Sequence, residues 1–156
     1  MNRVMHIYAK FEKLPFGKSL FSKLICFKAP YFSTIRPHFE ELRPGYCAIT
    51  MKKRRAVQNH IQSVHAIAMC NISELTAGTA LEATLPKTMR WIPKSMHVEY
   101  LKIAKTDLKA VCEIPTHNLE SPQELPLTVH VTDTNNTEVF RAVITMHISK
   151  RGEKDV

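Results

Sequence analysis

Helical and strand-like hydrophobic patterns alternate along this chain, and the first is helical. Residues 1–30 form two short segments of helical spacing, interrupted at Pro15-Phe16-Gly17. Proline and glycine end helices, so two short helices are predicted. An amphipathic membrane anchor or a targeting peptide is one interpretation. Glu12 and the interruption favour helices that cover one edge of the domain. In the second helix, apolar residues gather towards one side, with Lys18 and Lys23 on another: Leu20, Phe21, Leu24, Ile25 and Phe27.

A longer helical pattern occupies the middle of the chain, from Ser63 to Leu81. Ser63 is a good N-cap residue. A helix that is apolar nearly all round must be wrapped by its surroundings. Among these apolar residues, the carboxylate of Glu74 is costly unless something charged, polar or reactive faces it. The residues that define the pattern fall at three- and four-residue steps: Ile67, Cys70, Asn71, Glu74, Gly78 and Leu81.

Strand-like patterns flank this helix. Before it, residues 34–42 and 46–55 are predicted strands joined by a turn at Arg43-Pro44-Gly45. After it, Pro86 and Pro93 bracket an expected irregular loop that contains Trp91. Turn residues at 105–107 and 133–136 predict two hairpins, and therefore an antiparallel sheet. The four strands expected after the helix cover residues 96–104, 108–114, 125–132 and 139–149.

A curved sheet closing over the central helix would bury it. The prediction is therefore an α+β fold, with an antiparallel curved sheet wrapped around one long central helix and two N-terminal helices. At 156 residues and 44% apolar composition, the chain is expected to be one domain over residues 1–156. Within it, residues 1–33 are a helical extension and residues 34–150 form the core.

The cysteines and the apolar runs restrict the cellular setting. The four cysteines are widely scattered and include no C-x-x-C pair, which favours reduced thiols in a cytoplasmic protein. No apolar run approaches the ~20 residues that cross a membrane, so we expect no integral membrane association.

Positive charge is concentrated near the N-terminus. Residues 1–55 hold twelve Lys/Arg and three Asp/Glu, a net of +9, whereas residues 56–156 carry a net of −1. The basic part ends in Lys52, Lys53, Arg54 and Arg55. Such a run attracts an anionic ligand, a nucleic acid or an acidic membrane, or it is simply a solvated strand end. Nucleic acid is not expected, because no aromatic residues interleave with the run.

His65 and Glu74 are nine residues apart on the predicted helix. That spacing puts them on opposite faces and some 13 Å apart along the axis, so they cannot cooperate within one chain. Either the two are unrelated, or two copies of the helix lie side by side and share each site. A metal site is not expected, because His60 and His65 are five residues apart rather than four and no cysteine is suitably paired.

Several segments together resemble the hotdog-fold acyl-CoA thioesterases, in the branch related to the phenylacetate-pathway enzymes and a neighbouring uncharacterised group. The family signature of Asn, a His-Gly pair opening the helix and a later carboxylate is similar to Asn59, His65-Ala66 and Glu74. Residues 98–104 resemble the strand after the family's helix. Residues 29–32 and 42–45 look like the uncharacterised group. The resemblance covers roughly residues 29–150 and implies a hotdog fold.

The resemblance also implies roles across a homodimer, or a pair of such dimers. The backbone N–H of Ala66 would stabilise the oxyanion, Glu74 would activate water or attack the thioester, and Asn59 would orient the water or the thioester. His65 would support the loop or contact the thioester. Ala66 and Gln62 stand where the family commonly has Gly, and Glu74 replaces the Asp of many relatives.

Three functions are weighed on this basis. The first is a thioester hydrolase acting on acyl-CoA or acyl-carrier protein, with coenzyme A as part of the substrate and no further cofactor. Lys52, Lys53, Arg54 and Arg55 could then hold the coenzyme A phosphates. The second is a hotdog dehydratase or hydratase, for which His60 and Glu74 are suitably spaced but the Pro- and Gly-rich loop is missing. The third is a non-enzymatic acyl-CoA-binding module.

Overall fold

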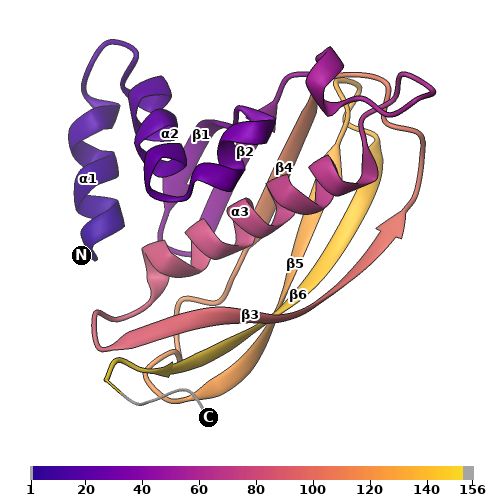
Figure 1. Cartoon of the computed structure of the whole chain (residues 1–156). Helices are drawn as coiled ribbons and strands as arrows, with labels where there is room; N and C mark the ends of the chain where they lie inside the picture. The colour runs from indigo at the N-terminus through magenta and orange to yellow at the C-terminus, as the bar shows by residue number, and fades with distance from the viewer. Residues whose placement is uncertain (1, 153–156) are drawn as a thin grey trace.

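A six-stranded antiparallel sheet curves around one long helix in the computed structural model of the protein, which describes residues 2–152 (Figure 1). The strands lie in the order β1-β2-β4-β5-β6-β3. This is the predicted α+β hotdog architecture. Strands β1 and β3 form the two edges of the sheet, and α3 lies across its inner face. The strands are β1 (His38–Arg43), β2 (Tyr46–Met51), β3 (Met89–Tyr100), β4 (Leu108–Glu113), β5 (Gln123–Thr132) and β6 (Glu138–Lys150).

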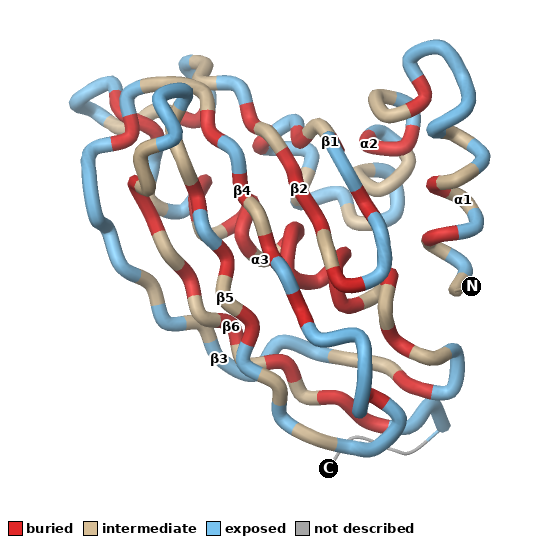
Figure 2. Tube along the Cα trace, turned by 180° about the vertical axis from the view of Figure 1, so that it is seen from behind, coloured by how far each residue is buried: buried red, intermediate tan, exposed pale blue. Residues whose placement is uncertain are grey.

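The central helix α3 (Ala66–Thr84) supplies much of the core. Ile72, Ala77, Ala80 and Leu81 are fully buried against the inward side chains of the sheet. The strands alternate buried and more exposed positions, as expected for a sheet with one face on the core (Figure 2). The helix begins at Ala66 with His65 as its N-cap, so the prediction of Ser63 as the cap was wrong. Ser63 is instead buried in the preceding loop.

Two helices, α1 (Arg3–Glu12) and α2 (Gly17–Lys28), precede the sheet, and the predicted break at residues 15–17 is confirmed. Helix α2 covers the β1 edge, where the Ser22 hydroxyl accepts a hydrogen bond from the Phe39 N–H. Phe21 packs edge-to-face against both Tyr8 and Phe39. Of the predicted apolar face only Phe21 is fully buried, whereas Phe27 is 82% exposed. Among residues 2–152, no helix is long and apolar enough to cross a membrane.

The structure contains two short 3-10 helices, η1 (Pro30–Ile35) and η2 (Arg55–Val57). They include residues that were predicted to be the ends of strands. Within η1, the Ser33 hydroxyl donates a hydrogen bond to the Pro30 carbonyl, and the Thr34 hydroxyl donates one to the Tyr31 carbonyl. Such local bonds compete with strand pairing. Strand β1 therefore begins at His38 rather than at residue 34.

Two other predictions after the helix were wrong. Trp91 and Pro93 belong to β3, which begins at Met89 rather than at residue 96. Pro93 is tolerated there because β3 is an edge strand with an irregular register between Pro93 and Ser95. The turn at 105–107 does not close a hairpin, since β3 pairs with β6 and not with β4. The hairpin at 133–136, between β5 and β6, is confirmed.

Candidate active site

The loop before α3 is held by its own polar groups. The Asn59 side-chain oxygen accepts hydrogen bonds from the backbone N–H groups of Ile61 and Ser63, each at 3.1 Å. The Asn59 side-chain nitrogen donates to the Ser63 hydroxyl at 2.8 Å. Gln62 adopts φ of 62°, the left-handed conformation that glycine adopts most easily. The Asn59 amide is therefore used in shaping the loop.

His65 caps the helix that follows. Its Nδ1 accepts a hydrogen bond from the Ile67 N–H at 3.1 Å, so a neutral ring carries its proton on Nε2. The His65 carbonyl accepts from the Ala68 N–H. The Ala66 N–H comes first in the helix and has no hydrogen-bond partner among residues 2–152. An amide at a helix N-terminus can stabilise developing negative charge.

Glu74 lies on the side of α3 that the sheet leaves partly open. One turn before it, the Cys70 thiol is in hydrogen-bond contact with the Tyr100 side chain at the end of β3. One turn after it, Gly78 faces the Trp91 ring of β3. Glu74 is therefore between these two contacts, half-buried, and no ion pair or hydrogen bond of its side chain is found within residues 2–152.

Glu74 and the Ala66 N–H do not meet within one chain. They are eight residues apart on α3, which corresponds to about 12 Å along the helix axis. The structure therefore brings Asn59, His65 and Ala66 together at the start of α3 and leaves Glu74 apart from them. Within one chain the separation is as the helical spacing predicts, and both alternatives remain: the two are unrelated, or two copies of the helix share each site.

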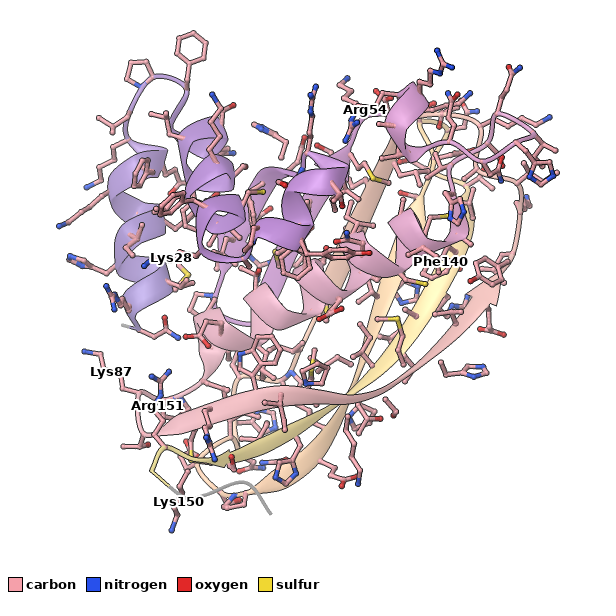
Figure 3. The ribbon with its side chains drawn as sticks, in the orientation of Figure 1. Lys28, Arg54, Lys87, Phe140, Lys150 and Arg151 are labelled. Atoms are coloured by element: carbon pink, nitrogen blue, oxygen red, sulfur yellow. The ribbon has the colours of Figure 1, made fainter. Side chains whose placement is uncertain are left out.

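The residues of the predicted basic run, Lys52 to Arg55, contact different parts of the protein. The Lys52 ammonium forms an ion pair with Asp107 at 2.8 Å, and the Lys53 N–H donates to the same carboxylate. The Lys52 contact lowers the pKa of Asp107. The Arg54 guanidinium instead donates to the Thr34 carbonyl of η1 (Figure 3). Arg55 is exposed. The four residues thus do not form one continuous cationic surface.

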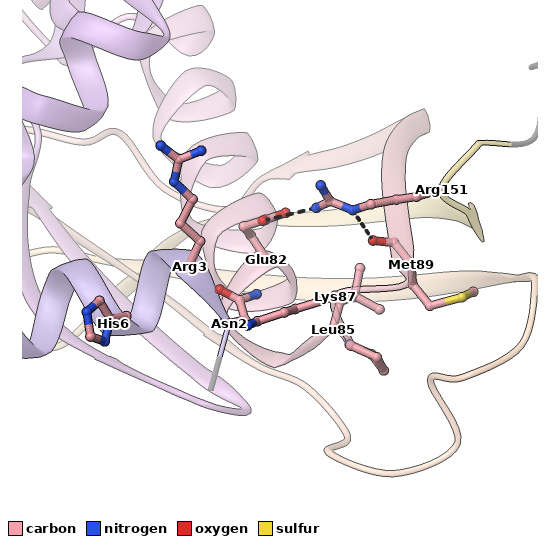
Figure 4. A pocket seen from close by; sticks show the side chains of 9 residues that line it. Asn2, Arg3, His6, Glu82, Leu85, Lys87, Met89 and Arg151 are labelled. Carbon is pink, nitrogen blue, oxygen red and sulfur yellow. Dashed lines mark hydrogen bonds and ion pairs between the residues drawn. The ribbon is translucent and has the colours of Figure 1, made fainter.

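Two cavities lie at opposite ends of α3. The larger, about 560 Å³, lies between the start of α1 and the turn after α3, where Arg151 contacts Glu82 (Figure 4). The smaller, about 180 Å³, lies at the start of α3. We place the candidate site at the smaller one because His65 is in its wall. It is lined by Tyr31, Thr34, Ile35, Ala56, Val57, Gln58, His65, Ile67, Ala68 and Asn71.

Exposed apolar side chains surround the same end of the helix. Ile67 is 55% exposed and Ile103 is 61% exposed. The 101–104 segment is fastened to the loop before α3 because the Val64 N–H donates to the Ala104 carbonyl at 2.8 Å. Contiguous apolar surface of this kind marks an interaction site. The exposed apolar patch consists of Ile61, Ile67, Tyr100, Leu101 and Ile103.

Sequence reasoning missed Asn71 as a functional candidate. It is 6% exposed, lines the small cavity, and its side-chain oxygen is buried without a hydrogen-bond partner among residues 2–152. The signal was available, because an amide in an apolar helix raises the same question as the Glu74 carboxylate. In the same described range, no three His, Cys, Asp or Glu residues are grouped so as to hold a metal ion.

The fold and the position of the candidate site define a hotdog-fold protein. The chain matches the model of a domain of unknown function, DUF4442, over residues 17–148 and belongs to that family. No curated protein matches it significantly. A crystal structure from a genomics project is 41% identical, with a TM-score of 0.84, and the match covers 94% of this chain and 98% of the other.

More distant structures share the fold. A Pseudomonas aeruginosa protein of unknown function, for which thioesterase activity is suggested, has a TM-score of 0.77 at 20% identity, covering 88% of this chain and 97% of that one. A variant of a Staphylococcus aureus thioesterase has a TM-score of 0.68 at 16% identity, covering 77% and 98%. At these identities the similarity establishes the fold.

Proposed function

We propose that this protein hydrolyses thioesters of coenzyme A or acyl-carrier protein, as a homodimer or a pair of dimers. The observation that carries the proposal is the position of Glu74. It is a carboxylate without a partner among residues 2–152, on the partly open side of an otherwise buried helix. A half-buried carboxylate without a partner in the described chain can act on a bound thioester. The phenylacetate-like branch of the thioesterases is the relationship that best fits these residues.

In the proposed reaction, Glu74 of one subunit faces the start of α3 in the other. The Ala66 N–H would receive the oxyanion formed on the thioester carbonyl. Glu74 would take a proton from the attacking water, or attack the carbonyl itself. Asn59 and His65 would hold the loop and the helix start in place, in keeping with their hydrogen bonds.

The proposed dimer forms through β3. The other edge strand, β1, is covered by α2, whereas the outer edge of β3 has no neighbouring strand in the described chain. A long uncovered edge invites pairing with another chain. The exposed apolar patch adjoins the end of β3, so it would lie beside such a partner. Two β3 strands paired in this way would bring the two α3 helices side by side.

Hydrolysis assays test the chemistry. Wild-type protein is expected to hydrolyse at least one member of a panel of acyl-CoA thioesters. Glu74→Gln should lower kcat/KM by roughly 10²-fold or more, the usual effect of losing a general base. Glu82→Gln is the matched control, since it lies two turns further along the same helix and keeps an oxygen for Trp91. Full activity in Glu74→Gln would rule out this role.

Sedimentation tests the assembly. One chain has a mass of 17.9 kDa, so a dimer should sediment near twice that mass. Substituting both Leu101 and Ile103 with Glu should give monomers and abolish hydrolysis. Phe27→Glu, at a still more exposed apolar residue on α2, should leave the dimer intact. A wild-type monomer that hydrolyses thioesters would contradict the shared site.

A second candidate is a non-enzymatic acyl-CoA-binding module. It is favoured by the Asn59 amide, whose oxygen and nitrogen are both engaged within the loop. Because its oxygen already accepts two hydrogen bonds within the loop, such an amide has only its second Nδ2–H to offer a water. Binding of coenzyme A without hydrolysis of any acyl-CoA in the panel would support this candidate over the first.

A further inference from the structure

Two arginines converge on the end of η1. Arg36 is the C-terminal cap of η1 and adopts φ of 49°, a left-handed conformation that is unusual for a residue with a side chain. Arg54 comes from the segment before η2 and donates from its Nη2 to the carbonyl of Thr34, two residues before Arg36. Figure 3 shows Arg54 at this junction. The fold therefore places two cationic side chains at one point.

Neither arginine is ion-paired in the described chain, although Arg36 also borders a cavity that Glu40 and Asp107 line. Within residues 2–152, neither forms an ion pair with a carboxylate, and the Arg54 Nε is buried without a hydrogen-bond partner. Desolvation lowers the pKa of Arg54, and the nearby positive charge of Arg36 lowers it further. Like charges held together disfavour the folded state unless an anion compensates them.

Capping of η1 explains only part of this arrangement. One arginine donor is enough for the Thr34 carbonyl. Capping therefore does not account for the second cation, Arg36, or for the Arg54 Nε–H, which has no acceptor in the described chain. Lys52 differs, because its ammonium is paired with Asp107, which also accepts the backbone N–H of Lys53. Of the predicted basic run, Arg54 alone combines partial burial with a buried unused donor.

The pair adjoins the candidate active site. Thr34, whose carbonyl binds Arg54, also lines the small cavity that includes His65. Arg36 lies on the rim of another cavity, of about 570 Å³, together with Lys23, Ser33 and His38. The two cavities thus border different residues of η1, Thr34 in the small cavity and Ser33 in the larger one.

We propose that Arg36 and Arg54 bind the phosphate ester of the thioester's carrier, either coenzyme A or the phosphopantetheine of a carrier protein. The inference rests on the proposed function in taking such a thioester as the ligand. Guanidinium groups are suited to this, because they donate two parallel hydrogen bonds to a phosphate and keep their charge. The phosphate would supply the anion that neither arginine has in the described chain.

Calorimetric binding of four probes tests the site without turnover: coenzyme A, dephospho-coenzyme A, 4′-phosphopantetheine and pantetheine. Arg36→Gln and Arg54→Gln should each raise the Kd of 4′-phosphopantetheine about tenfold, the effect of losing one charged hydrogen bond. Pantetheine binding should not change. Arg43→Gln makes the same charge change at an exposed arginine paired with Glu41, and should have little effect. Arg36 is exposed, so its variant should fold normally.

The four probes also identify the source of the phosphate. Equal Kd values for coenzyme A and 4′-phosphopantetheine would support the phosphate next to pantetheine, which both carriers share. If wild-type protein binds coenzyme A more tightly than dephospho-coenzyme A, and both variants lose this difference, the bound group is the 3′-phosphate of free coenzyme A. Wild-type protein that binds pantetheine as tightly as 4′-phosphopantetheine and dephospho-coenzyme A as tightly as coenzyme A would overturn the proposal. Failure to bind coenzyme A, or unchanged Kd values for all four probes in both variants, would also overturn it.

Failure of this site and failure of the proposed hydrolysis are separable. Glu74→Gln should keep wild-type Kd values for all four probes, because Glu74 is on α3, away from Arg36 and Arg54. Binding that depends on the two arginines, in a protein that hydrolyses no thioester, would contradict the proposed hydrolysis and support the phosphate site. Hydrolysis by a protein whose ligand binding does not depend on the phosphate would support the hydrolase and contradict the phosphate site.

Discussion

Asn71 on α3 donates its side-chain N–H to the Thr34 hydroxyl of η1 at 3.1 Å. The Thr34 hydroxyl uses its own hydrogen in a bond to the Tyr31 carbonyl at 2.8 Å, so it can only accept from Asn71. This fixes the orientation of the Asn71 amide. Its oxygen is left buried and without a partner among residues 2–152.

Asn71→Leu is expected to stabilise the protein. It removes an unpaired buried acceptor that disfavours folding by about 1–3 kcal/mol, against the loss of one hydrogen bond of about 1 kcal/mol. The adjoining cavity gives the larger side chain room. Urea unfolding should show a higher free energy of unfolding. Thr34→Val should have the opposite effect, because it leaves the Asn71 N–H unpaired as well. Lower stability of Asn71→Leu would show that the amide has a structural role.

Gly78→Ala is expected to displace Trp91. A Cβ at Gly78 would lie 2.5 Å from the Trp91 ring, too close for van der Waals contact. Moving the ring outward would break the 3.0 Å hydrogen bond from its Nε1 to Glu82. Trp91 is the single tryptophan, so its fluorescence reports this site alone. The emission maximum should shift to longer wavelength in Gly78→Ala and remain unchanged in Ala80→Gly. An unchanged spectrum in Gly78→Ala would mean that the helix shifts instead.

Acid should destabilise the protein through Glu138. The Arg141 guanidinium, together with His130, lowers the pKa of this carboxyl from 4.5 to about 2. Between these values the unfolded chain binds the proton more readily, so this contribution to stability is complete above pH 4.5 and is lost as the pH falls towards 2. The stability difference between wild type and Glu138→Gln should therefore shrink from pH 6 to about pH 2. Glu120→Gln, an exposed control, should track the wild type throughout. A constant difference for Glu138→Gln would exclude the linkage.

Two of the four thiols should resist modification in the folded protein. Cys47 and Cys112 face each other across β2 and β4 and are both fully buried. Burial raises the pKa of both, that of Cys112 to about 12. Ellman's reagent at pH 8 should react readily with Cys26 and Cys70 only, and with all four thiols in guanidinium chloride. Cys112→Ala should leave the fast fraction unchanged. Equal rates for all four thiols without denaturant would contradict this burial.

The same thiols predict lower stability in alkali. In the unfolded chain Cys112 would ionise from its ordinary pKa of 9.0, whereas in the folded protein it stays protonated to about 12. The unfolded state is therefore favoured as the pH rises through this range. Unfolding midpoints measured from pH 8 to about pH 11 should fall less steeply for Cys112→Ala than for the wild type. Parallel curves would remove Cys112 as a cause.

Local sequence determined the elements but not their neighbours. The period of the apolar residues gave α3, β5 and β6, and the Pro-Gly break gave the two N-terminal helices. The pairing of β3 with β6 could not be predicted in this way, because a turn at 105–107 looks the same whether it closes a hairpin or crosses the end of the sheet. Pro93 was a misleading signal for the same reason, since its effect depends on whether the strand lies at an edge.

By itself, the sequence determined that a carboxylate would occur in a buried helix and that it could not meet the start of the same helix, because both follow from helical spacing. Only the tertiary structure decided which side of the helix is open, that Asp107 engages Lys52 and Lys53, and that Arg36 and Arg54 meet at η1. These are contacts between segments far apart in the chain. They depend on how strands and loops pack in three dimensions, which no local pattern encodes.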